Sequence, residues 1–132
     1  MGDVVVAKLA GFCFGVSRAV ESVENTIDGR SEIYTLGKLI HNPTFIKKLE
    51  EKGVRVIDDS MLDEIFASAD EKHPVTVCTR AHGVTRDISA KLSGMAAKNS
   101  FFKVVDCTCP YVAKIHKIAR ECPKNAIFCV LG

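Results

Sequence analysis

The stretch Gly11-Phe12-Cys13-Phe14-Gly15-Val16 decides how this chain folds. An apolar run over residues 4–9 precedes it and predicts a buried strand, whereas the residues from Val16 onward have the spacing of an amphipathic helix. Cys13 therefore lies where a strand gives way to a helix, between glycines that allow a tight turn. The N–H groups at a helix start favour a thiolate, which is the form of cysteine that binds metals and iron–sulfur clusters. An isolated cysteine is more often a small buried residue, so whether Cys13 is a ligand or a core residue depends on the motifs in the rest of the chain.

Apolar segments and helical segments alternate along the rest of the chain. We expect strands over residues 33–36, 54–57, 74–79, 101–105 and 126–131, and helices that begin near residues 43, 60, 84 and 110. Asn42 before Pro43 is a good helix cap, and Ser60 with Asp63 resembles a capping box. Strands that alternate with helices predict an α/β fold, a mainly parallel sheet covered by helices.

Composition narrows the classes of function. The 132 residues are 47% hydrophobic and 26% charged, with a net charge of +2 and no basic stripe, so nucleic acid is not expected as a partner. No apolar run is long enough to span a membrane, and Asp3 stands where a secretion signal would be basic. A core of this size does not need disulfides, so we expect the six cysteines to be reduced and the protein to be cytoplasmic.

Four residues whose side chains can bind a ligand or transfer a proton lie in four different strand-to-helix loops: Cys13, His41, His82 and Cys109. In a parallel sheet these loops share one edge, where ligands bind, so we expect a site there. Cys13 and Cys109 form the better thiolate pair because each precedes a helix start. The two histidines can donate hydrogen bonds to phosphate or transfer a proton, although each could equally cap a nearby backbone group.

The other cysteines are expected to be structural. Alternation in an extended segment points Cys107 away from Cys109, as a small filler. Cys78 and Cys129 fall inside apolar strands, and Cys122 falls near a helix end. His116 follows Cys109 on one helix at about 10 Å, so we expect it to pack rather than to serve the site.

Motifs in all four loops resemble those of the LytB family, the 4-hydroxy-3-methylbut-2-enyl diphosphate reductases. The motifs occur in the family's order and cover essentially the whole chain: Gly11 to Val16 with Arg18-Ala19, Ile40-His41-Asn42, Ala81-His82-Gly83-Val84, and Asp106-Cys107-Thr108-Cys109-Pro110 with Lys114-Ile115-His116. Any one of them alone would be a weak signal.

The resemblance implies an enzyme of the non-mevalonate isoprenoid pathway, an oxidoreductase that removes the allylic hydroxyl of its substrate as water and forms isopentenyl and dimethylallyl diphosphates. It implies that Cys13 and Cys109 match two of the three cysteines that hold a 4Fe-4S cluster. It implies that His41 and His82 hold the diphosphate of the substrate, and that reduced ferredoxin or flavodoxin donates electrons.

The chain departs from the family in two respects. Cys107 replaces the alanine that the family usually has, and the third cluster cysteine and the proton-supplying glutamate are not found in the 132 residues. We therefore expect an N-terminal portion of a three-lobed trefoil enzyme, one lobe plus the start of the next, with a lobe boundary near residues 107–110. The isolated chain is then expected to be inactive and prone to self-association. The alternative is a non-catalytic thiol- or metal-binding α/β module.

Overall fold

The computed structural model describes residues 2–5 and 11–131. Its centre is a four-stranded parallel sheet in the order β2-β1-β3-β4, which confirms the predicted α/β class. The strands are β1 (Glu32–Leu36), β2 (Val54–Ile57), β3 (Val75–Thr79) and β4 (Phe102–Val105). Because all pairs are parallel, the loops that leave β1, β3 and β4 emerge at the same edge of the sheet.

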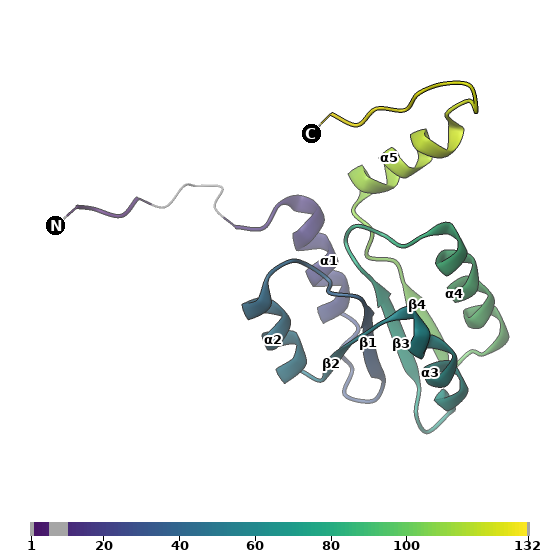
Figure 1. Cartoon of the computed structure of the whole chain (residues 1–132). Helices are drawn as coiled ribbons and strands as arrows, with labels where there is room; N and C mark the ends of the chain where they lie inside the picture. Colours follow the sequence, from purple (N-terminus) through teal and green to yellow (C-terminus); the bar gives the residue numbers. More distant parts are fainter. Residues whose placement is uncertain (1, 6–10, 132) are drawn as a thin grey trace.

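Helices cover both faces of the sheet, so the core has two layers (Figure 1). The helices on one face are α1 (Phe14–Glu24) and α2 (Pro43–Glu51), and those on the other are α3 (Leu62–Ser68) and α4 (Arg86–Lys98). Ala19 and Val23 of α1 are fully buried, as are Leu62 of α3 and, to within 1%, Leu92 of α4. None of the helices in the described part of the chain is long and apolar enough to cross a membrane.

Helix starts follow local side-chain chemistry. Asn42 caps α2 by accepting a hydrogen bond from the Phe45 amide at 3.1 Å, as predicted, with Pro43 in the first turn. The predicted capping box of Ser60 is wrong, because Asp58 instead accepts from the Ser60 amide at 2.9 Å. That bond starts the short 3₁₀ helix η1 (Asp59–Met61), and α3 continues directly from it.

Two predicted strands are not confirmed. Residues 2–5 are exposed and outside any strand, with Val4 at 91%, and the remainder of the predicted strand over residues 4–9 falls outside the described residues. The predicted strand over 126–131 is wrong, since this segment is not paired and Leu131 is 97% exposed. An apolar run alone does not make a strand where no neighbouring strand is available to accept its hydrogen bonds.

Helix α5 (Pro110–Glu121) differs from the other α-helices because none of its residues is buried. It leaves the end of β4 and stands beside the sheet rather than on it (Figure 1). Its apolar side chains Tyr111, Ile115 and Ile118 are 68%, 42% and 47% exposed. The sheet with its four packed helices therefore forms the body of the molecule, and α5 projects from the edge where the loops gather.

Candidate functional site

Backbone hydrogen bonds join three loops at the carboxyl end of the sheet. The Ala81 amide donates to the Leu39 carbonyl at 3.3 Å, and the Cys109 amide donates to the Ala81 carbonyl at 2.8 Å. The β1–α2, β3–α4 and β4–α5 loops are thus tied in series, and Ala81 is the central link. This arrangement places His41, His82 and Cys109 on one edge of the molecule, as the sequence predicts.

The two histidines meet at this edge. The ring centroids of His41 and His82 are 5.2 Å apart with a 42° tilt, and both side chains are exposed. Arg80 supports the same region, because its Nε donates to the Gly83 carbonyl at 3.0 Å. A Cβ on Gly37 would lie 3.4 Å from the Arg80 guanidinium, so this side chain lies against both loops that carry the histidines.

Cys13 and Cys109 are the N-cap residues of α1 and α5, and neither side chain caps its own helix. Gly15 brings the start of α1 against Cys109: a methyl group added there would lie 2.9 Å from the Cys109 Cβ and closer still to its Sγ. Arg18 of α1 donates to the Thr108 carbonyl at 3.2 Å. The Cys109 thiol therefore lies against the first turn of the helix that Cys13 begins.

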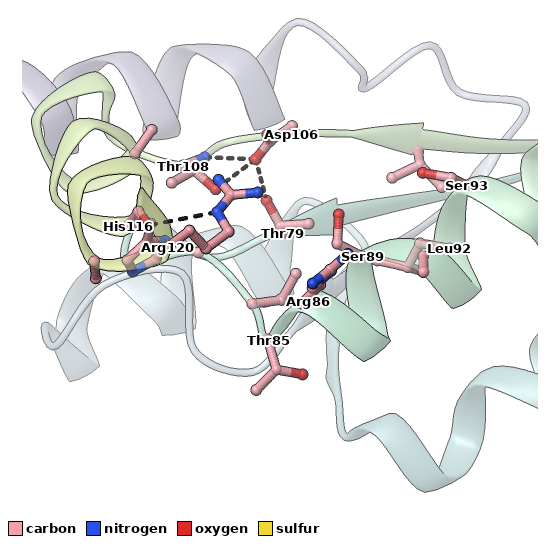
Figure 2. Close-up of a pocket in the computed structure, with 16 residues that line it drawn as sticks. Thr79, Thr85, Arg86, Ser89, Leu92, Ser93, Asp106, Thr108, His116 and Arg120 are labelled. Carbon is pink, nitrogen blue, oxygen red and sulfur yellow. Dashed lines mark hydrogen bonds between the residues drawn. The ribbon is translucent and has the colours of Figure 1, made fainter. Parts of the chain in front are cut away.

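An acidic residue that sequence reasoning missed organises the β4–α5 loop. Asp106 accepts hydrogen bonds from the Thr79 hydroxyl at 2.9 Å and from the Thr108 amide and hydroxyl at 3.0 and 2.5 Å (Figure 2). Burial opposes ionisation of Asp106, but the bonds from Thr108 and Thr79 outweigh it and hold the pKa of the carboxyl below its usual range. Asp106 directly follows a predicted strand, and this position could have identified it as a residue of the site from the sequence alone.

A hollow of about 670 Å³ lies between α4 and α5 on the other side of this loop (Figure 2). Asp106, Thr108, His116 and Arg120 line it. His116 was predicted to pack rather than to serve the site, and the structure leaves its side chain exposed. Its ring packs against the turn at Gly83, where an added Cβ would lie 3.0 Å from it.

The remaining cysteines divide between the core and the surface. Cys78 and Cys107 are fully buried, which confirms that Cys107 points away from Cys109 and fills the core. Cys122 is half-buried. The prediction that Cys129 lies inside a strand is wrong, since it is exposed in the unpaired segment.

The two loop thiols fit an iron–sulfur cluster in chemistry but do not complete its coordination. Cys13 and Cys109 are soft donors at helix N-termini, and the lack of a side chain at Gly15 leaves room for the Cys109 thiol against α1. Within residues 2–5 and 11–131, however, no group of three His, Cys, Asp or Glu side chains could hold a metal ion.

Comparison with known proteins gives a consistent result. The LytB protein family matches residues 4–132. A 4-hydroxy-3-methylbut-2-enyl diphosphate reductase of Thermoanaerobacter sp. (strain X514) is 41% identical over 121 residues, which are 89% of this chain and 38% of the relative. The same enzyme of Thermotoga petrophila is 36% identical over 98% of this chain and 41% of the relative.

Solved structures resemble the fold as well. The E-1-hydroxy-2-methyl-but-2-enyl-4-diphosphate reductase of Plasmodium falciparum aligns with a TM-score of 0.67 and 33% identity, over 86% of this chain and 32% of that one. A second (E)-4-hydroxy-3-methyl-but-2-enyl diphosphate reductase, described as the terminal enzyme of the non-mevalonate pathway, aligns with a TM-score of 0.65 over 96% and 44%. The chain spans about two fifths of the curated relatives it matches. This chain belongs to the LytB protein family.

Proposed function

We propose that this chain forms the part of a 4-hydroxy-3-methylbut-2-enyl diphosphate reductase that supplies two cluster ligands and the diphosphate-binding histidines. One observation carries the proposal: Gly15 of α1 touches Cys109 at the same loop edge where His41 and His82 meet. Membership of the LytB protein family, and relatives named as this reductase, support assigning cluster and diphosphate binding to this edge. Thiols and imidazoles brought together by separate loops suit a site that must hold both a cluster and an anion.

In this proposal Cys13 and Cys109 act as thiolate ligands. An iron–sulfur cluster, when bound, supplies the electrons that reduce the allylic alcohol. The chain's own contribution is to orient the ligands. The bond from Cys109 N–H to Ala81 fixes one loop, and the Arg18 contact with Thr108 keeps α1 against it. Both contacts use groups other than the thiols, which therefore remain available for coordination.

His41 and His82 are proposed to bind the diphosphate of the allylic substrate. Their rings are close enough to address one anionic group together, and both are exposed to an incoming ligand. His41 directly precedes the cap of α2, and His82 lies shortly before Thr85, the cap of α4. The partial positive charge at these two helix starts adds to the attraction for an anion.

The remaining components are proposed to come from the part of the relatives' length that this chain does not span. These are the third cluster cysteine, the proton-supplying glutamate and the contact surface for reduced ferredoxin or flavodoxin. The chain then corresponds to the N-terminal lobe, with the lobe boundary near residues 107–110. That α5 begins at Pro110 and buries none of its residues supports a boundary there.

Anaerobic reconstitution with iron and sulfide tests the ligand assignment. Cys13→Ser and Cys109→Ser are expected to abolish visible absorption and bound iron, because serine is a poor substitute for a thiolate ligand. Cys129→Ser is the matched control, since Cys129 is an exposed cysteine remote from the loops in sequence. Equal loss of iron in all three variants would refute the assignment.

The absence of a three-donor group in residues 2–5 and 11–131 favours a second candidate for this stretch taken alone, a thiol module without reductase chemistry. Binding of inorganic diphosphate, measured by calorimetry, separates the two. The reductase proposal requires binding that weakens in His41→Ala and His82→Ala but not in His73→Ala, a control in an exposed connector. A module of the second kind would bind iron and show no diphosphate binding.

A further inference from the structure

The hollow between α4 and α5 has no part in the proposed function. Its lining comes mainly from α4, α5 and the β4–α5 loop, and neither His41 nor His82 is among the described residues that line it. Its volume of about 670 Å³ is typical of sites that bind small molecules. The hollow therefore has room for a small metabolite in addition to whatever the histidines bind.

Basic side chains outnumber acidic ones along the hollow. Arg86 of α4, together with His116 and Arg120 of α5, lines it. Among the described lining residues the one acidic group is the carboxylate of Asp106. Because both guanidinium groups stay charged at any pH at which a protein is folded, the hollow favours an anionic ligand.

The guanidinium groups of both arginines are available to a ligand. In the described part of the chain no ion pair joins Arg86 or Arg120 to a carboxylate. Arg120 uses its Nε to donate to the His116 carbonyl at 3.4 Å, which leaves its terminal nitrogens free, and both side chains are exposed. Paired guanidinium N–H groups match the spacing of phosphate oxygens.

The Asp106 carboxylate has one oxygen to spare. Its three hydrogen bonds, from the Thr79 hydroxyl and from the amide and hydroxyl of Thr108, all end on Oδ1. Oδ2 accepts none from the residues that the structure describes. In Figure 2 the Arg120 side chain extends from α5 toward Asp106, although the two form no ion pair. A ligand that offers an anion to the arginine and a hydroxyl group to Oδ2 satisfies both.

We propose that this hollow binds a small phosphate monoester that also carries a hydroxyl group. The phosphate contacts Arg86 and Arg120, and the ligand hydroxyl donates to Oδ2 of Asp106. A phosphate monoester is close to dianionic at neutral pH and has three terminal oxygens, so it can engage two guanidinium groups at once. Val84 and Val104 line the same hollow and offer apolar surface to the carbon skeleton. The proposal does not depend on the proposed function.

Glycerol phosphate is the probe, titrated into the folded chain and followed by calorimetry and by amide NMR shifts. We expect the amides of Gly83, Ser89 and Thr108, which line the hollow, to shift. Methyl phosphate lacks the hydroxyl group and should bind more weakly. Arg86→Gln and Arg120→Gln should each weaken glycerol phosphate binding about tenfold or more, because each removes a charged hydrogen-bond donor.

Lys98→Gln and Lys114→Gln are the matched controls. Each removes one charge from an exposed side chain of the same two helices, at a position outside the described lining of the hollow. Both should bind glycerol phosphate as tightly as the wild type. Equal weakening in the lysine and arginine variants would mean that the basic surface attracts anions without a site, and it would overturn the proposal, as would an absence of binding.

The histidine variants separate this hollow from the proposed diphosphate site. His41→Ala and His82→Ala should retain the glycerol phosphate binding that the arginine variants lose. Binding lost in the histidine variants but kept in the arginine variants would place the probe at the loop edge and overturn the proposal for the hollow. Conversely, failure of the iron and inorganic diphosphate tests with glycerol phosphate binding intact would overturn the proposed function alone.

Discussion

Helices α1 and α5 both begin at a candidate cluster cysteine, yet only α1 packs against the core. Two residues after Cys13 stands Gly15, which is buried against Cys109, whereas two residues after Cys109 stands Tyr111, which is 68% exposed. Helix α1 buries Ala19 and Val23 in the core, and α5 buries nothing. The Cys13 side of the site therefore depends on helix packing. The Cys109 side depends on the loop before its helix.

The largest expected effect comes from removing the close approach at Gly15. Gly15→Ala places a methyl group 2.9 Å from the Cys109 Cβ, so α1 or the loop must move, at a cost of about 2–3 kcal/mol in the free energy of unfolding. We also expect reconstituted iron to be lost, because the added methyl group displaces the Cys109 thiol. Tyr111→Ala is the matched change two residues after Cys109. We expect this variant to unfold at the same urea concentration as the wild type and to bind as much iron in the iron assay.

The second largest effect is expected from truncating apolar side chains, which should destabilise the protein more in α1 than in α5. Val23→Ala removes two buried methyl groups from α1 and is expected to lower the free energy of unfolding by about 2 kcal/mol. Ile118→Ala removes more carbon from a half-exposed face of α5 and should change it by less than about 0.5 kcal/mol. Urea unfolding of both variants measures this directly. Equal losses would mean that α5 is packed in solution.

A smaller effect is expected where the two helices are linked. Arg18→Met keeps the aliphatic stem but removes the hydrogen bond to the Thr108 carbonyl, which is worth about 1 kcal/mol or less at this exposed position. Amide hydrogen exchange should accelerate over residues 106–110, because α1 no longer restrains the loop. Lys114→Met, on α5, removes a charge from an exposed side chain without a described hydrogen bond to that loop and serves as the control.

Much of the body of the molecule could be predicted from local sequence. The apolar segments that became β1 to β4 are bounded by turn residues, and Asn42 with Pro43 defines the start of α2 unambiguously. Parallel order followed from the alternation with helices, and it correctly placed His41, His82 and Cys109 at one edge.

The helix cap at Asp58 was missed although it is local, but the other failures depend on contacts between residues distant in sequence. Residues 126–131 have strand composition but pair with no strand in the part of the chain that the structure describes, and Cys129 is exposed rather than buried. Asp106 was missed because its role depends on Thr79 of another strand. The close approach of Gly15 to Cys109 likewise joins residues that no local pattern relates.

The smallest expected effect concerns the acid dependence of the loop before α5. The pKa of Asp106 is held below its usual value because bonds from Thr108 and Thr79 outweigh its burial, and Arg18 adds a favourable charge. A lowered pKa in the folded state contributes stability above the unfolded pKa of about 4, and this contribution is lost as the pH falls through the folded value. Asp106 is exposed, so solvent screening limits the contribution to less than about 1 kcal/mol.

Asp106→Asn isolates this contribution, since the amide oxygen can still accept from Thr108 but carries no charge. We expect the difference in free energy of unfolding between wild type and variant to be constant from about pH 7 to about pH 5 and to shrink below about pH 4. Asp28, whose pKa is lowered to about 2 by the Ser31 and Arg30 amides and the Ser31 hydroxyl, titrates in both proteins and cancels in the difference. A difference that does not change with pH would mean that Asp106 holds the loop through hydrogen bonds alone. In that case the loop that carries Cys109 would keep its geometry in acid, and only the packing of α1 would distinguish the two sides of the site.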